Sequence, residues 1–157
     1  MTSKALRGFT LVELITTIVI VGILSAVAIP RMFDNSAFSE RGYIDEVSSA
    51  LSYAQKIAIA SRCEVSFAID ATGAYTANQR STFNNCVAKT GPWTMAIRRS
   101  DGSSLTGKPP SDAILTPAAT IVFDENGRVS NGSPPVISVG PFTLTVDQPT
   151  GLVLVQP

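Results

Sequence analysis

The feature that most limits how this chain can fold is an apolar run near its N-terminus, from Phe9 to Ile29. Glu13 is the single charged residue among these 21 residues. As an α-helix the run is about 32 Å long, which matches the hydrocarbon thickness of a lipid bilayer. The run therefore predicts one helix that spans a membrane, followed by a domain outside it.

The residues before the run indicate its orientation. Lys4 and Arg7 lie within residues 1–8, which contain no acidic residue. Positive charge next to a membrane helix favours the cytoplasmic side. We therefore expect residues 1–8 in the cytoplasm and residues 31–157 across the membrane.

Two ordinary interpretations of the apolar run compete with a more specific one. A basic start, an apolar run and the small residues around Ala26-Val27-Ala28 fit a cleaved secretory signal. A plain, uncleaved anchor is the other ordinary interpretation. Neither gains from Glu13, since a carboxylate in a membrane helix costs roughly 2–3 kcal/mol near the centre and less near the interface. A position in the headgroup layer would reduce that cost, so Glu13 alone does not decide between them.

The block from Gly8 to Leu14, Gly-Phe-Thr-Leu-Val-Glu-Leu, decides the question. It resembles the prepilin processing site shared by type IV pilins and the pseudopilins of type II secretion. The resemblance runs from the short basic leader to Pro30. It implies that a prepilin peptidase cuts the Gly8–Phe9 bond and methylates the new amino group of Phe9. We therefore favour a prepilin segment over a secretory signal.

Glu13 has a physical function in this interpretation. After the cut, Phe9 carries an α-amino cation one helical turn from the Glu13 carboxylate. When subunits pack side by side, the carboxylate of one can meet the amine of another. An unpaired buried charge is costly, so the pair is expected to fix the axial register between subunits.

Gly22 and Pro30 are expected to weaken the same helix. Glycine disfavours helix by about 1 kcal/mol relative to alanine, and proline removes a backbone donor. The stretch between these two helix-breaking residues is predicted to bend or melt when it packs in a filament. The alternative is that Pro30 only marks the exit from the membrane.

The remainder of the chain has the pattern of one globular domain. Apolar residues at spacings of three and four predict an amphipathic helix from Tyr43 to about Ala60. Alternating and continuous apolar runs, separated by loops rich in Gly, Pro and Ser, predict strands after it. These strands are expected at residues 65–69, 74–78, 93–97, 120–123, 142–146 and 152–155.

The predicted fold class is therefore α+β and pilin-like. A long N-terminal helix, half membrane-embedded and half amphipathic, packs on a mainly antiparallel sheet. The predicted divisions are a prepilin leader (1–8), a transmembrane and assembly helix (9–30) and a periplasmic globular domain (31–157).

Cys63 and Cys86 are the two cysteines of the chain, and they do not form a Cys-x-x-Cys redox motif. Outside the cytoplasm a single structural disulfide is the natural interpretation. In the chain-entropy model, closing a loop of this length contributes about 3.4 kcal/mol. Two unpaired buried thiols are the alternative.

Composition argues against most catalytic functions. The chain has no histidine, which excludes Ser-His-Asp and Cys-His triads and histidine-based zinc sites. The acidic pairs Asp45-Glu46 and Asp124-Glu125 and the basic pair Arg98-Arg99 are interpreted as solvated surface. We therefore expect no enzyme activity, no cofactor and no metal.

The charge distribution also gives no support for nucleic-acid binding. Lysine plus arginine equals aspartate plus glutamate, at 12 each, and residues 129–157 contain no basic residue. DNA-uptake pilins of the FimT-like group depend on basic residues near the C-terminus, so the absence of such residues argues against DNA uptake here.

The resemblance implies a minor pilin or pseudopilin that is anchored in the inner membrane and then incorporated into a pilus or pseudopilus. Its implied partners are other pilins or pseudopilins, the prepilin peptidase, the inner-membrane assembly platform and the lipid bilayer. Residues 49–60 and 121–128 are similar to the pseudopilin H and FimT-like group. The residues around Pro30 and Cys63 are similar to the MshC-like minor pilins of the MSHA pilus. The alternative is a pilus-borne binding module, an adhesin or a DNA-uptake pilin.

Overall fold

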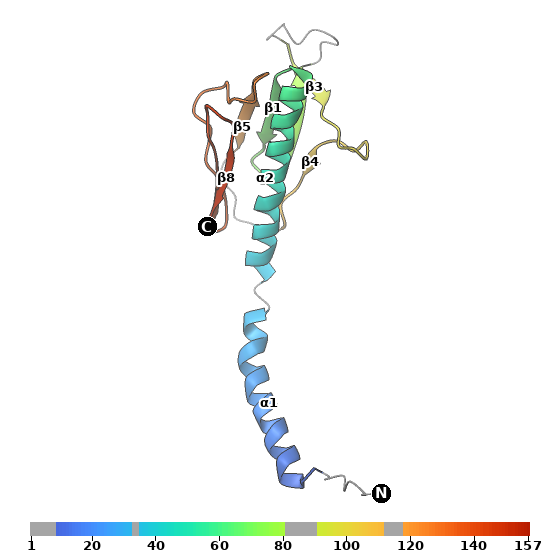
Figure 1. Ribbon diagram of the computed structural model, residues 1–157, viewed down its shortest axis with the longest axis vertical. Helices are drawn as coiled ribbons and strands as arrows, with labels where there is room; N and C mark the ends of the chain where they lie inside the picture. Colours follow the sequence, from blue (N-terminus) through green and yellow to red (C-terminus); the bar gives the residue numbers. More distant parts are fainter. Residues whose placement is uncertain (1–8, 33–34, 81–90, 112–117) are drawn as a thin grey trace, which may run out of the picture. The chain divides into compact units, whose positions relative to one another are not determined.

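The computed structural model describes residues 9–32, 35–80, 91–111 and 118–157 (Figure 1). The chain divides into two compact units, Met1–Asn35 and Ser36–Pro157. The first unit contains one helix, and the second contains a helix with two antiparallel sheets.

Helix α1 (Leu11–Met32) is the only secondary-structure element that lies wholly in the first unit among the described residues. It runs through Gly22 and continues two residues beyond Pro30. The predicted break between Gly22 and Pro30 concerned a subunit packed in a filament, so it stays a prediction. Within the described residues, none of the helices has the combined length and hydropathy of a membrane-spanning helix.

Helix α2 (Asn35–Ser61) begins eight residues before the predicted start at Tyr43, so that predicted boundary was wrong. The added turns make contacts that the spacing of apolar residues does not reveal. Glu40 is buried against the backbone of Gly140, where a Cβ atom would lie 2.1 Å from its Oε2. Tertiary contact therefore stabilises a stretch that the hydropathy pattern leaves undecided.

Arg41 adds a second contact to these early turns. Its guanidinium carbon lies 5.2 Å from the ring centroid of Phe142, and its Nε donates to Asp45 Oδ2 at 3.0 Å. Both Arg41 and Asp45 are about half exposed, so the ion pair itself contributes little to stability. The stacking of Arg41 on Phe142 instead connects α2 with the second sheet.

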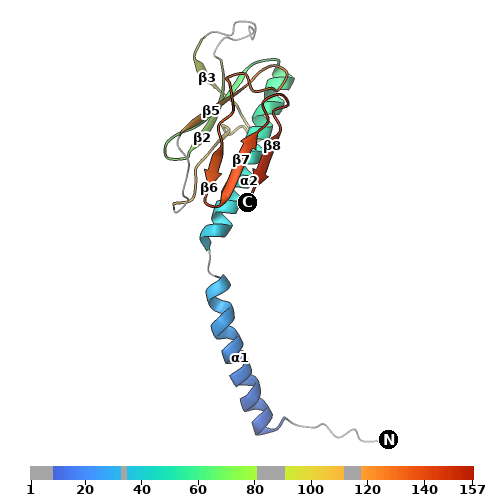
Figure 2. The same ribbon diagram turned by 90° about the vertical axis from the view of Figure 1, so that its left-hand side faces the viewer.

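The strands form two antiparallel sheets, which Figure 2 shows from a second side. The first has the order β3-β2-β1-β5, with β4 paired to β2, and the second has the order β6-β7-β8. The strands are β1 (Val65–Ile69), β2 (Tyr75–Arg80), β3 (Trp93–Ala96), β4 (Thr106–Gly107), β5 (Ala119–Phe123), β6 (Ile137–Val139), β7 (Phe142–Val146) and β8 (Val153–Gln156).

The predicted α+β fold class is confirmed. All six predicted strands are present with ends that differ by at most two residues from the predicted ones. Strands β4 and β6 were not predicted, because two and three residues are too short for a period-2 pattern to be recognised.

The hydrophobic core of the second unit lies between α2 and both sheets. From α2, the fully buried residues Ile44, Val47 and Leu51 face this core. The apolar face predicted for the amphipathic helix is therefore confirmed. The sheets contribute Phe67, Tyr75, Ile121, Phe123, Val139, Leu144 and Val146.

Gln55 joins the loops of the two sheets to α2. Its Nε2 donates to the carbonyl oxygens of Gly127 and Thr150, at 2.9 Å each. Gly151 is required next to these contacts, since it has a φ of 66° and a Cβ there would lie 2.0 Å from the Gly127 oxygen. A polar residue of α2 therefore fixes the distance between two turns.

We predict that Gln55→Ala lowers the free energy of unfolding by about 2 kcal/mol, because two hydrogen bonds to backbone carbonyls are lost. Urea unfolding of the full chain in detergent, followed by Trp93 fluorescence, measures the change. Lys56→Ala, at the exposed neighbouring position, is the matched control and should change stability by less than about 0.5 kcal/mol. Equal stability of the Gln55 variant and the control would contradict this account.

Candidate functional site

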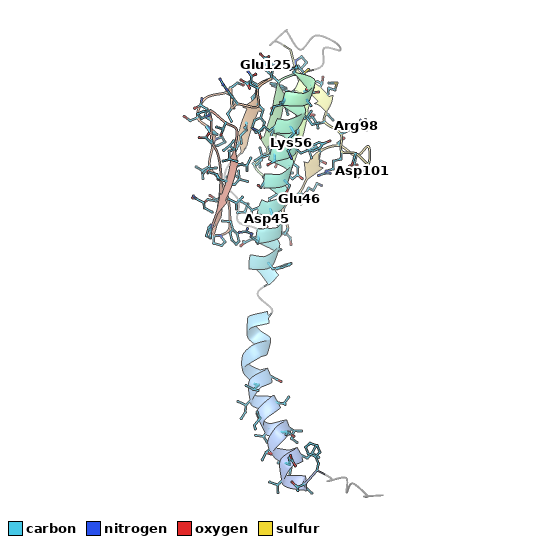
Figure 3. All side chains as sticks on the ribbon, viewed as in Figure 1. Asp45, Glu46, Lys56, Arg98, Asp101 and Glu125 are labelled. Atoms are coloured by element: carbon cyan, nitrogen blue, oxygen red, sulfur yellow. The ribbon has the colours of Figure 1, made fainter. Side chains whose placement is uncertain are left out.

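The most unusual surface of the protein is that of α1. Its large apolar side chains are exposed on every side of the helix, with fractional exposures from 48% at Ile15 to 73% at Leu11. Figure 3 shows these side chains along α1. A helix that packs on one core has an apolar stripe, whereas a helix that is apolar all round requires an apolar environment all round. The exposed set is Leu11, Val12, Leu14, Ile15, Ile18, Val19, Ile20, Val21, Ile23 and Leu24.

The hydroxyl groups of α1 are satisfied by the helix itself. Thr16 donates to the carbonyl of Glu13 at 3.0 Å, and Thr17 donates to that of Leu14 at 2.8 Å. Ser25 donates to the carbonyl of Val21 at 2.7 Å. Hydroxyls that bond to the preceding turn need no partner outside the helix, which makes them compatible with lipid or with an apolar interface.

Thr10 determines where α1 begins. Its Oγ1 accepts the Glu13 amide at 3.2 Å, and its carbonyl accepts the Leu14 amide at 3.1 Å. This is an N-cap, which satisfies one of the amides that a helix start leaves unpaired. This N-cap was not predicted from the sequence, although Thr-x-x-Glu is the spacing of a capping box.

Glu13 is the third residue of α1, one turn from the exposed and non-helical Phe9. No ion pair or side-chain hydrogen bond joins its carboxylate to another residue in the described ranges. A negative charge in the first turn is favoured by the helix dipole. Gly8 lies outside the described residues.

The predicted disulfide stays a prediction. Cys63 follows the end of α2 by two residues, and Cys86 lies outside the described residues. No cluster of three or more His, Cys, Asp or Glu in the described ranges could hold a metal ion.

The interpretation of Arg98-Arg99 and of Asp45-Glu46 as purely solvated surface needs correction. Arg99 donates to the carbonyls of Ser104 and Thr106 and to the Tyr75 hydroxyl, at 3.2, 3.1 and 3.2 Å. The Tyr75 hydroxyl donates to Glu46 Oε1 at 2.7 Å. Glu46 and Arg99, joined through the Tyr75 hydroxyl, therefore hold the loop before β4 near α2. Glu46 is labelled in Figure 3.

Burial and nearby acidic side chains raise the pKa of two tyrosines of the core, Tyr43 and Tyr75. Burial, then Glu46 and Asp70, raise the pKa of Tyr43 to about 12. Burial, followed by the hydrogen bond with Glu46, raises the pKa of Tyr75 further. Both hydroxyls therefore remain hydrogen-bond donors throughout the physiological pH range, Tyr43 to the carbonyl of Gly73 and Tyr75 to Glu46.

The fold and the exposed helix define a class of subunit: an α+β domain preceded by a helix that must be covered by apolar surroundings. Residues 4–29 match the family model described as the prokaryotic N-terminal methylation motif. The matched residues include Gly8, Phe9 and Glu13.

A curated relative extends the match into the domain. The chain is 32% identical over 100 residues to the type IV narrow pilus major component PilA5 of Thermus thermophilus, and the match covers 57% of this chain and 86% of the relative. No solved structure matches. The chain belongs to the type IV pilin family, so it is a type IV pilin subunit. Because the relative is a pilus component, the relationship supports a structural function over an enzymatic one.

We predict that Thr10→Ala frays the first turn of α1, because the Glu13 amide loses its acceptor at a cost of about 1 kcal/mol. Amide hydrogen exchange of the full chain in detergent micelles should show about fivefold faster exchange at Glu13. Thr10→Ser retains the hydroxyl and should exchange like the wild type. Equal exchange rates for Thr10→Ala and Thr10→Ser would show that the cap contributes nothing.

Proposed function

We propose that this chain is a minor pilin or pseudopilin subunit that a prepilin peptidase cuts between Gly8 and Phe9 and methylates on Phe9. Residues 9–30 anchor it in the inner membrane, with residues 1–8 in the cytoplasm and residues 31–157 in the periplasm. The subunit then enters a filament with other pilins or pseudopilins. The observation that carries the proposal is the apolar surface exposed on every side of α1 between Leu11 and Leu24.

Two environments satisfy such a surface. A bilayer covers it before assembly, and the N-terminal helices of neighbouring subunits cover it afterwards. The internal hydrogen bonds of Thr16, Thr17 and Ser25 suit both, since neither environment supplies water. An exposed apolar face of this extent on a water-soluble domain would instead drive aggregation.

Glu13 supplies the specificity that apolar contacts lack. Apolar helices pack in many axial registers with similar energies, whereas a carboxylate must find a cation. The α-amino group of a processed Phe9 is a cation of the required kind at the required depth. Before the cut this amine does not exist, so processing makes assembly possible.

The type of filament system that the subunit serves is proposed from sequence similarities outside the N-terminal motif. Similarity to the MshC-like and to the pseudopilin H and FimT-like groups favours either an MSHA-like pilus or a type II secretion pseudopilus. The assembly partners are then the other subunits and the inner-membrane assembly platform. Residues 129–157 carry Asp147 as their only charge, which gives no basis for DNA binding.

Mass spectrometry of the protein from its native membrane tests the processing step. The expected mature chain begins at Phe9 and carries one methyl group on its amine. Gly8→Val should leave the full-length precursor, since a branched side chain at the cut is expected to block the peptidase, while Ala5→Ser in the leader should be processed normally. A mature chain that begins at Ile29 would identify a secretory signal and refute the proposal.

The register function of Glu13 is tested by Glu13→Gln, which keeps the size of the side chain and removes its charge. Cleavage and methylation should be unchanged, but the subunit recovered in sheared filaments should fall by roughly a hundredfold, because the buried amine loses its partner. Immunoblots of filament and membrane fractions measure this ratio. Glu13→Asp, which retains the charge, should recover part of the assembly. Wild-type incorporation of Glu13→Gln would show that the charge does not set the register.

A further inference from the structure

The dipeptide Asn-Gly occurs twice in this chain, at Asn126-Gly127 and at Asn131-Gly132. In such a pair the backbone nitrogen of the glycine can attack the side-chain carbonyl carbon of the asparagine, because the glycine has no Cβ that hinders the approach. The attack requires a carboxamide that is free to rotate and a glycine amide that can leave its hydrogen bond. The two pairs have the same chemistry, so their surroundings decide which of them reacts.

The carboxamide of Asn131 is held at both of its polar atoms. Its Oδ1 accepts the Val122 amide at 3.0 Å, and its Nδ2 donates to the carbonyl of Thr120 at 2.7 Å. Both hydrogen bonds to the β5 backbone must break before the side-chain carbon can turn towards the nitrogen of Gly132. The native fold should therefore protect this asparagine.

The carboxamide of Asn126 is exposed and makes no hydrogen bond to a residue that the structure describes. Only the backbone is held here, in the turn after β5 in which Figure 3 labels Glu125. The Asn126 amide donates to Asp124 Oδ1, and the Gly127 amide donates to the Asp124 carbonyl, at 2.9 Å each. Attack by the Gly127 nitrogen breaks the second of these bonds alone, so this site has the lower barrier.

We propose that Asn126 is a site of spontaneous modification, whereas Asn131 is protected by the native fold. The Gly127 nitrogen loses its proton to water and bonds to the side-chain carbon of Asn126, whose bond to Nδ2 breaks and releases ammonia. Water then opens the resulting succinimide ring at one of its carbonyl carbons, which leaves aspartate or isoaspartate. The inference concerns the second unit alone and does not depend on the function proposed for α1.

The isoaspartate product should release this turn from α2. Its main chain runs through the former side chain, which adds one carbon atom directly before Gly127. The Gly127 carbonyl accepts Gln55 Nε2 at 2.9 Å, and a Cβ on Gly127 would lie 2.7 Å from Ile59 Cδ1. A longer main chain does not fit this close packing, so the contact with Gln55 is lost. The aspartate product keeps the main-chain length and adds only a charge.

Peptide mapping by mass spectrometry tests which asparagine reacts. The full chain in detergent micelles is incubated in mildly alkaline buffer, and a second sample is incubated in guanidinium chloride. In the folded chain Asn126 should convert roughly fivefold faster than Asn131, the factor that corresponds to one hydrogen bond. In the unfolded chain the two rates should agree within about twofold, because neither carboxamide is held. Equal rates in the folded chain, a faster Asn131, or an unreactive Asn126 while the unfolded chain reacts would overturn the proposal.

Two substitutions separate the effect of isomerisation from that of charge. Asn126→Ser removes the carboxamide and should abolish the modified peptide without changing the rate at Asn131. Asn126→Asp carries the added charge on a main chain of normal length, so it should unfold in urea close to the wild type. The modified fraction, assayed for isoaspartate with a protein isoaspartyl methyltransferase, should unfold at a lower urea concentration, as Gln55→Ala does. An isoaspartate fraction as stable as Asn126→Asp would refute the release of the turn from α2.

Discussion

The constraint on which the rest of this protein depends is that α1 has no polar side. A helix whose apolar residues surround its axis cannot find enough cover in a domain of this size, so other molecules must supply it. The polar side chains of α1 that the structure describes fit this condition. The hydroxyls bond to the preceding turn, Thr10 closes the first turn, and Glu13 lies within that first turn.

The second unit has a different requirement, because its helix α2 must be held in one position against the two sheets. Apolar residues of α2 fill the space between two small sheets, but they do not determine how the connecting loops run. Polar residues do so: Gln55 joins two turns, and Glu46, through Tyr75 and Arg99, fixes the loop before β4. Each contact pairs a side chain with backbone or with a buried hydroxyl, so it has a defined geometry.

The sequence predicted the parts of the fold that depend on periodicity. The apolar run, the amphipathic face of α2 and the longer strands all have patterns that repeat over several residues. What it missed depends on single contacts between distant residues. The early start of α2 depends on Glu40 and Arg41, which contact the β6–β7 hairpin, and the structural function of Arg99 depends on Tyr75. The cap at Thr10 is different, since its local Thr-x-x-Glu signal was present and was overlooked.

The internal bonding of Thr16, Thr17 and Ser25 has a consequence for how a subunit could change its surroundings. Moving a helix from lipid into a protein bundle usually requires polar groups to break one set of hydrogen bonds and form another, which creates a kinetic barrier. Here the hydroxyls keep the same acceptors throughout. In the assembly that we propose, these three hydroxyls would cross from lipid to protein without exchanging a hydrogen bond, and neutralisation of the Glu13 carboxylate would be the electrostatic step that controls the timing.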